Sequence, residues 1–191
     1  MTNIIFIVGG DYQISRLFKE YGWGETDDIN EATALCFTGG EDVSPLLYGA
    51  HPRKETYCNP DRDREEIAVL RSVPFGTPCI GICRGGQFLN VMAGGSMHQH
   101  VYGHTKTHMA TDLFSGGDVI VTSTHHQMMF AANHGEILLV ASEWNAAADV
   151  EAVWYSGFNY LCYQPHPEYS INSYCAKLFF KYIDKFIVDP S

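Results

Sequence analysis

Short apolar runs alternate along the chain with longer stretches in which apolar residues recur at helical spacing. The runs have the length and composition of β-strands buried on both faces of a sheet, and they cover residues 3–8, 34–37, 79–82, 118–122, 137–142, 150–154 and 160–163. The helical spacing predicts helices over residues 12–21, 61–70, 87–93 and 171–186, with one helical turn at 44–49. Strands that alternate with helices predict an α/β fold with a mostly parallel, doubly wound sheet, into which residues 96–117 insert a small β-hairpin.

Length and composition fit one domain over residues 1–191. The chain has 46% hydrophobic and 18% charged residues, with no repeat, no low-complexity tract and no apolar run long enough to cross a membrane. The first residues carry no basic leader, so we expect a cytoplasmic protein whose six cysteines are reduced thiols. A net charge of −10 argues against nucleic acid or an anionic membrane as a partner, because both attract clustered Lys and Arg.

Cys83 occupies an abrupt turn between a predicted strand and a predicted helix. It follows the apolar run 79–82, and Gly81, Gly85 and Gly86 surround it. A side chain at such a turn is held by a strained backbone, and the N-terminus of the following helix favours a thiolate over a thiol. A cysteine after an apolar strand is nevertheless more often a core residue than a nucleophile. The assignment therefore depends on partner groups elsewhere in the chain.

His166 and Glu168 are the partner groups that a nucleophilic cysteine needs. Residues i and i+2 of an extended segment point the same way, so Glu168 can fix which ring nitrogen of His166 faces the sulfur. Taken alone, this segment would be a surface loop with a solvated acid. Cys83, His125 and His166 all follow predicted strands, and ligands of doubly wound folds bind beyond the carboxyl ends of the strands. Together these positions predict a catalytic Cys83–His166–Glu168 arrangement.

Catalysis by such a cysteine also requires donors for a developing oxyanion. The backbone N–H of Arg84 is one donor by position, since this residue follows the nucleophile. The Gly39-Gly40 turn can supply a second, because glycine lets the backbone approach closely. An ordinary glycine turn is an equally good interpretation of Gly39 and Gly40.

Four histidines fall within a short polar segment, at His98, His100, His104 and His108. Histidine is a common metal ligand, and His104 and His108 are four residues apart. No carboxylate at helical spacing accompanies them in a segment that is expected to be a hairpin. We therefore expect no metal site.

The motifs resemble those of the class I glutamine amidotransferase superfamily. The nucleophile segment Gly81-Ile82-Cys83-Arg84-Gly85-Gly86-Gln87 and the segment His166-Pro167-Glu168 carry this resemblance. More narrowly, the chain is similar to the γ-glutamyl hydrolase-like branch, peptidase family C26, which includes γ-glutamyl-γ-aminobutyrate hydrolases. The residues that match this branch are Gly39 to Pro45, Leu47-Tyr48-Gly49, Arg62-Asp63, Glu66, Asn90-Val91, Gly94-Gly95-Ser96, Gln99 and His125-His126-Gln127.

The resemblance implies a flavodoxin-like three-layer sandwich and an enzyme without a metal or organic cofactor. Cys83 would attack the side-chain carbonyl of glutamine or of a γ-glutamyl amide. His166 would then protonate the leaving amine, and water would hydrolyse the γ-glutamyl thioester to release glutamate. The resemblance assigns substrate contacts to Gln87, Thr124, His125 and His126.

Three functions remain open at the level of sequence. The first is a stand-alone γ-glutamyl hydrolase, and the second is a glutaminase subunit that passes ammonia to a separate synthase. The third is a catalytically silent binding protein of the same fold, against which the intact Cys83, His166 and Glu168 argue. The sequence also leaves a homodimer open. The chain is short for this branch in segments that often shape the pocket, so the identity of the amine stays open as well.

Overall fold

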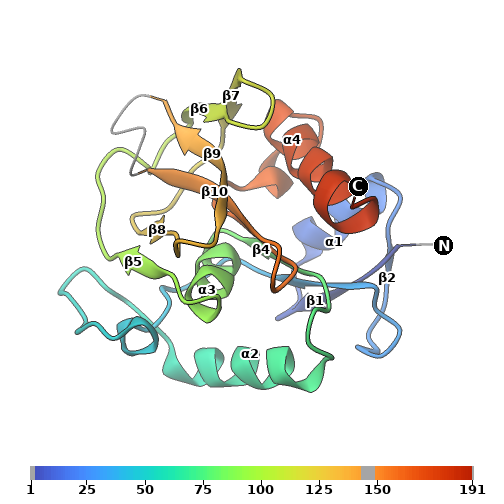
Figure 1. Ribbon diagram of the computed structural model, residues 1–191, viewed down its shortest axis with the longest axis horizontal. Coiled ribbons are helices and arrows are strands. Elements are labelled where there is room, and N and C mark those ends of the chain that lie inside the picture. Colours follow the sequence, from blue (N-terminus) through green and yellow to red (C-terminus); the bar gives the residue numbers. More distant parts are fainter. Residues whose placement is uncertain (1–2, 143–148, 191) are drawn as a thin grey trace.

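The computed structural model describes residues 3–142 and 149–190, which form an open sheet with helices on both faces (Figure 1). The strands are β1 (Ile4–Val8), β2 (Gly24–Glu25), β3 (Ala34–Phe37), β4 (Cys79–Ile82), β5 (Ser96–His98), β6 (His108–Asp112), β7 (Gly117–Val121), β8 (Met128–Phe130), β9 (Glu136–Ala141), β10 (Val150–Tyr155) and β11 (Tyr160–Tyr163). The helices are α1 (Tyr12–Glu20), α2 (Pro60–Ser72), α3 (Arg84–Met92) and α4 (Tyr174–Ile183), with the shorter turns η1 (Pro45–Tyr48), η2 (Pro167–Tyr169) and η3 (Asp184–Val188).

The sheet consists of a parallel half and an antiparallel half. Its order is β2-β1-β3-β4-β11-β10-β9-β6-β7, and β8 pairs with both β10 and β5. The parallel half consists of β2, β1, β3, β4 and β11. From β11 onward, through β10, β9, β6 and β7, each strand pairs antiparallel with the next. The α/β class is confirmed, and the antiparallel half is larger than a single inserted hairpin. Its consecutive strands are joined by short connections, which allow antiparallel pairing but leave no room for a crossover helix.

The helices form the two outer layers. Helices α1 and α4 pack on one face of the sheet, where Leu17, Phe18 and Phe179 lie in one apolar cluster. Helices α2 and α3 cover the other face, with Phe88 and Leu89 buried in a second cluster. Each such fully buried side chain contributes on the order of 2 kcal/mol to folding. The three-layer arrangement brings the carboxyl ends of β3, β4 and β11 to one edge.

Helix α3 begins at Arg84, three residues before the expected start. Gly85 and Gly86 are poor helix formers, but they lie where the helix touches the sheet. A Cβ on Gly85 would collide with the backbone carbonyl of Phe37, and one on Gly86 would lie 2.9 Å from the amide nitrogen of Tyr163. The close packing of α3 on the sheet therefore outweighs the low helix propensity of the two glycines.

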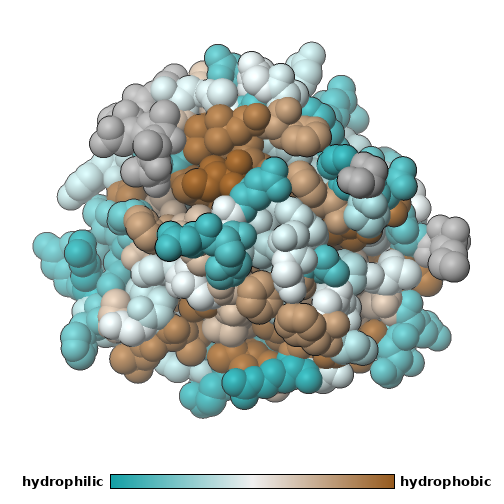
Figure 2. Space-filling view, in the orientation of Figure 1, coloured by the Kyte–Doolittle hydropathy of each residue, from teal (hydrophilic) through white to brown (hydrophobic). Residues whose placement is uncertain are grey.

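Polar residues cover much of the face drawn in Figure 2, and apolar residues gather there in separate patches. Among the described residues, no helix is both long and apolar enough to span a bilayer. The six cysteines form no disulfide.

Candidate active site

Cys83 sits on a strained turn between β4 and α3. It is the N-cap residue of α3 and has φ 51° and ψ −113°, a conformation that residues other than glycine rarely adopt. Its N–H donates to the carbonyl oxygen of Tyr163 over 2.8 Å, and its side chain is 8% exposed. The backbone is thus forced into a conformation that holds the sulfur at the end of the strand, at the positive end of the helix dipole. This is the turn predicted from the sequence.

His166 and Glu168 form a close pair beside Cys83. Nδ1 of His166 lies 2.6 Å from Oε1 of Glu168. The surroundings of Gly39 show that Cys83 lies close to His166. A Cβ on Gly39 would stand 3.4 Å from Cε1 of His166 and 3.8 Å from Cβ of Cys83. The structure therefore brings Cys83, His166 and Glu168 together with Gly39, although the cysteine and the histidine are far apart in the chain.

The environment of His166 favours the charged imidazolium. Burial by itself lowers the pKa of a histidine, but interactions with Cys83 and with Glu168 outweigh it and raise the pKa of His166 to about 11. With Nδ1 on Glu168, Nε2 is the nitrogen left for chemistry, and it has no hydrogen-bond partner among the described residues. The ring also stacks on Tyr169, with centroids 4.5 Å apart and planes 8° apart. An imidazolium held in this way can hold a thiolate and later donate its proton.

These groups open into a cavity of about 300 Å³, the Cys83 cavity. Its lining comes from the segments after β3, β4, β7 and β11, from the start of α3 and from the segment before α2. The lining residues are Gly40, Glu41, Asp42, Tyr57, Cys83, Arg84, Gln87, Thr124, His125, His126, Gln127, His166 and Tyr169. Its size suits a small polar molecule and excludes a folded polypeptide chain.

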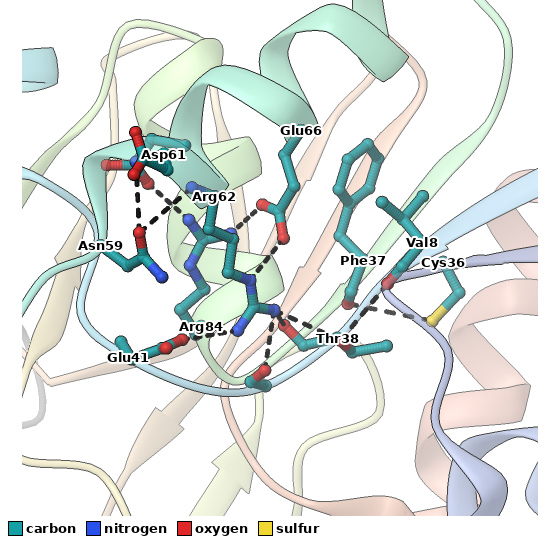
Figure 3. Close-up of polar contacts among 12 residues, drawn as sticks. Val8, Cys36, Phe37, Thr38, Glu41, Asn59, Asp61, Arg62, Glu66 and Arg84 are labelled. Atoms are coloured by element: carbon teal, nitrogen blue, oxygen red, sulfur yellow. Dashed lines mark hydrogen bonds and ion pairs between the residues drawn. The ribbon is translucent and has the colours of Figure 1, made fainter.

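Of the expected oxyanion residues, Gly40 and Arg84 line this cavity and Gly39 adjoins Gly40. Arg84 is the first residue of α3, so its N–H has no acceptor within the helix. Gly40 has φ 143°, and a Cβ there would collide with the guanidinium group of Arg62. Nη2 of Arg62 donates to the carbonyl oxygens of Gly39, over 2.9 Å, and Thr38, over 3.2 Å (Figure 3). Because Arg62 binds the carbonyl oxygens of this turn, the turn and its adjoining N–H groups are held in place.

Two arginines and three carboxylates support the turn from behind, and Figure 3 shows that Arg62 lies between Glu41 and Glu66. Arg62 is 2.9 Å from each of these two carboxylates, and its contact with Glu66 is an i,i+4 pair within α2. The side chain of Arg84 is almost fully buried and pairs with Asp63 and Glu66. Sequence reasoning used only the backbone of Arg84. Its side chain instead ties the nucleophile turn to α2.

Three buried glutamines lie at or beside the Cys83 cavity. Nε2 of Gln87 donates to Oε1 of Gln164 over 3.1 Å, and Nε2 of Gln164 is 3.6 Å from Sγ of Cys83. Gln127 is 1% exposed, and neither its Nε2 nor its Oε1 has a hydrogen-bond partner among the described residues. Sequence reasoning missed Gln127 and Gln164 as site residues. The sequence did place them beside His125-His126 and His166, which is the signal that could have found them.

The segment after β7 forms one wall, as expected for Thr124, His125 and His126. Thr124 is exposed to the cavity, while Nε2 of His126 lies 3.2 Å from Oδ1 of Asp42. Both ring nitrogens of His125 are directed elsewhere, Nδ1 to the carbonyl oxygen of Gln127 and Nε2 toward Glu151. A role of His125 in holding a ligand would therefore be played by its backbone.

The four histidines of the polar segment separate into two groups. His98 is exposed against Phe130, and His100 contacts His126. His104 and His108 are buried against Glu151 of β10, and these three residues could together hold a metal ion.

Comparison with known proteins finds related sequences and related folds. The model of the family Peptidase C26 matches residues 26–129 of the chain. A candidate glutamine amidotransferase of Mycobacterium tuberculosis is 34% identical over 166 residues, covering 75% of this chain and 53% of that protein. A candidate glutamine amidotransferase-like protein of Lactococcus lactis, YvdE, is 32% identical over 70% of this chain and 65% of its own length. The chain thus spans about half to two thirds of the length of these relatives.

Solved structures share the fold at low sequence identity. A candidate GMP synthase subunit from Thermoplasma acidophilum superimposes with a TM-score of 0.70 at 17% identity, over 95% of this chain and 92% of that one. PurLQS from Thermotoga maritima gives a TM-score of 0.67 at 16% identity, over 96% and 98% of the two chains. These similarities confirm the flavodoxin-like arrangement of sheet and helices.

Proposed function

The chain belongs to the peptidase C26 family, and we propose that it hydrolyses the γ-glutamyl amide bond of glutamine or of a small γ-glutamyl amine, with Cys83 as the nucleophile. The observation that carries the proposal is the convergence of a strained Cys83 and the His166–Glu168 pair in one cavity. A cysteine that is only packed in the core needs neither a left-handed backbone nor a charged imidazole at its side.

The reaction follows from the positions of these groups. The Cys83 thiolate adds to the amide carbonyl carbon, and the backbone N–H groups of Gly40 and Arg84 receive the oxyanion, with Gly39 shaping their turn. His166 gives its Nε2 proton to the amine as the C–N bond breaks, which leaves a γ-glutamyl thioester. The neutral His166 then takes a proton from water, and hydroxide displaces the thiolate to give glutamate. Glu168 keeps the imidazole oriented throughout.

The cavity also offers groups to hold a glutamyl substrate. Gln127 presents an unpaired amide, and Gln87 and Gln164 link the cavity wall to the sulfur. A site with buried hydrogen-bonding groups selects strongly for ligands that satisfy them. The polar lining therefore fits the α-amino and α-carboxylate groups of glutamate better than an apolar acyl chain.

A second candidate function is a glutaminase subunit that delivers ammonia to a partner synthase. It is favoured by the likeness to a GMP synthase subunit and to PurLQS, which the chain matches over nearly its full length. The two candidates share the same chemistry at Cys83 and differ in what activates it. A hydrolase is active by itself, whereas a glutaminase subunit is nearly idle without its partner.

The test is to incubate the purified chain with glutamine and with a panel of γ-glutamyl amides and to follow glutamate release. Cys83→Ala removes the nucleophile, and Cys58→Ala, at a half-buried thiol, is the matched control. Turnover that Cys58→Ala keeps and Cys83→Ala loses establishes the hydrolase and identifies its amine. Weak turnover together with Cys83-dependent labelling by a glutamine-like electrophile supports the glutaminase subunit. No turnover and no labelling would contradict both.

A further inference from the structure

A second histidine–carboxylate cluster lies beneath the wall of the Cys83 cavity. We call His104, His108, His125 and Glu151 the Glu151 cluster. All four are at most 7% exposed, and Glu151 is fully buried. Its Oε1 is 2.9 Å from Nε2 of His108 and 3.2 Å from Nδ1 of His104, and its Oε2 is 3.7 Å from Nε2 of His125. Three imidazoles, two from one short segment and one from the segment after β7, thus converge on one carboxylate.

The outer nitrogens of the three rings fix which nitrogen faces Glu151. Nδ1 of His108 lies 3.2 Å from the carbonyl oxygen of Lys106, and Nδ1 of His125 lies 2.8 Å from that of Gln127. A carbonyl oxygen only accepts, so both Nδ1 atoms carry a proton and both neutral rings turn an Nε2 lone pair toward Glu151. Nε2 of His104 is 3.6 Å from the Asp149 carboxylate, which likewise directs its Nδ1 inward.

Lone pairs therefore face a carboxylate, which is itself only an acceptor. Nδ1 of His104, Nε2 of His125 and Oε2 of Glu151 are buried without a hydrogen-bond partner among the described residues. Such an arrangement needs positive charge at its centre, because burying unpaired acceptors against one another is costly. Protonating all three rings would leave two net positive charges on the four residues, whereas one divalent cation leaves a single charge next to Asp149.

We propose that the Glu151 cluster binds one divalent transition-metal ion of the Zn²⁺ type, with His104, His108 and Glu151 as ligands and His125 as the fourth. Nitrogen and oxygen ligands about 2.1 Å from such an ion lie roughly 3.4 Å apart in a tetrahedral site. The candidate atoms of His104, His108 and Glu151 all lie within 4.8 Å of one another. Three imidazoles and a carboxylate are ligands that suit zinc better than calcium or magnesium.

The outer contacts match those of known metal sites. A histidine that binds a metal usually donates its other N–H to a carbonyl or carboxylate, which fixes the ring. Here the carbonyls of Lys106 and Gln127 and the carboxylate of Asp149 take that place. Four protein ligands in a sealed site indicate a structural ion and leave no open position for a substrate.

An ion in the Glu151 cluster would also affect the wall of the Cys83 cavity. His125 and Gln127 belong to the wall of the Cys83 cavity, and the backbone N–H of Gln164 donates to the carbonyl oxygen of Glu151. An ion held by His125 and Glu151 would therefore fix the segment 122–127 against β10. The sequence expectation of no metal site considered only carboxylates near the histidines in the chain, and Glu151 comes from a distant strand.

The first test uses the whole chain without substitution. The protein is treated with a chelator, dialysed, and titrated with Zn²⁺ or with Co²⁺, whose visible absorption reports four-coordinate binding. We expect about one equivalent of either metal to bind, intense Co²⁺ absorption bands, and a Tm that rises when the metal is restored. If neither metal changes the Tm or the spectrum, the proposal is overturned, and the imidazoles and Glu151 are held together by protons that they share.

The second test assigns the site to its residues. His104→Asn removes a proposed ligand, and His98→Asn removes an exposed histidine of the same segment as the control. We expect His98→Asn to keep one equivalent of metal and His104→Asn to lose the Co²⁺ bands and at least tenfold in affinity. Equal binding by both variants would overturn the assignment. If His104→Asn does not fold, the chelation and Co²⁺ measurements on the unsubstituted chain still decide the proposal.

Discussion

The molecule contains two histidine–carboxylate groups, and residues 122–127 contact both of them. At the Cys83 cavity, the imidazole of His166 pairs with the carboxylate of Glu168 through Nδ1, and its second nitrogen is available to Cys83. In the Glu151 cluster, three imidazoles surround one carboxylate and all are sealed from solvent. The same two functional groups therefore occur with different stoichiometry and different access.

The two groups differ in whether a ring nitrogen is available to exchange a proton with a ligand. His166 pairs with Glu168 through Nδ1 only, so Nε2 can exchange a proton with a ligand in the cavity. In the Glu151 cluster, both nitrogens of each ring have a neighbour that constrains them. A buried pair whose histidine lines a cavity suits catalysis, whereas a cluster whose ring nitrogens are all directed at neighbours suits binding and stability.

The largest expected effect is the loss of catalysis in His166→Asn. This change removes the proton donor to the leaving amine, so we expect kcat for glutamate release to fall about 10³-fold, which corresponds to roughly 4 kcal/mol. The Tm should fall as well, because the buried carboxylate of Glu168 loses the imidazolium that stabilises it. Steady-state kinetics and a thermal melt measure the two effects.

His51→Asn, at an exposed histidine, is the matched control and should keep both kcat and Tm. If His166→Asn lowers Tm strongly while its remaining kcat matches that of the control, His166 is structural and the comparison between the two groups fails.

The next largest effect is the destabilisation in Glu151→Gln. This change removes the charge of the carboxylate on which the three buried imidazoles converge, and with it their shared partner. We expect the free energy of unfolding to fall by about 3 kcal/mol, and Tm by roughly 10 °C in a chain of this length. Urea unfolding provides the measurement, with Glu136→Gln, an exposed glutamate on β9, as the control. Equal midpoints for the two variants would show that the cluster does not contribute to stability.

The contrast between the two groups also shows what sequence reasoning can reach. Cys83, His166 and Glu168 were predicted from short-range patterns, a strand followed by glycines and a His-Pro-Glu segment after the last strand. Parallel strands bring such turns to one edge of the sheet, so local patterns are sufficient for this site. The triad role itself stays a prediction until activity is measured.

The Glu151 cluster depends on contacts that no local pattern encodes. Glu151 lies within an apolar run, where its carboxylate gives no sign of a partner. Its contact with His108 depends on the antiparallel register of β6, β9 and β10, and the sequence predicted only a hairpin there. Strand register is set by the packing of the whole sheet. For the same reason the sequence missed the short strands β2 and β8.

A smaller effect is expected when the charge on Glu168 is removed. Cys83 and Glu168 together raise the pKa of His166 to about 11, although burial opposes them. The imidazolium, and the stability it contributes, is therefore fully present below the ordinary histidine pKa of about 6.5 and is lost as the pH rises through about 11. In Glu168→Gln the pKa of His166 falls, so the alkaline limb of kcat/KM should move to lower pH.

Loss of this charge-assisted hydrogen bond should also lower kcat about 30-fold at neutral pH, which corresponds to roughly 2 kcal/mol. Profiles of kcat/KM and of Cys83 alkylation against pH test both expectations. Glu41→Gln, at a cavity-lining carboxylate paired with Arg62, is the control for a change in the general field of the cavity. An alkaline limb that moves equally in the two variants would show that Glu168 has no specific link to His166.

The smallest effect is expected from Tyr169, which stacks on His166 with planes 8° apart. In the Glu151 cluster the corresponding stack is between His104 and His125, so there both rings carry titratable nitrogens. At the cavity the stacking partner has no nitrogen that could compete for the Nε2 proton. Tyr169→Leu removes the aromatic face while keeping apolar bulk, and Tyr169→Phe keeps the face. Stacked pairs of this kind are worth about 1 kcal/mol, so we expect Tyr169→Leu to lower kcat about fivefold and Tyr169→Phe to preserve it. If both variants lose the same activity, the phenol hydroxyl rather than the stack positions the imidazole.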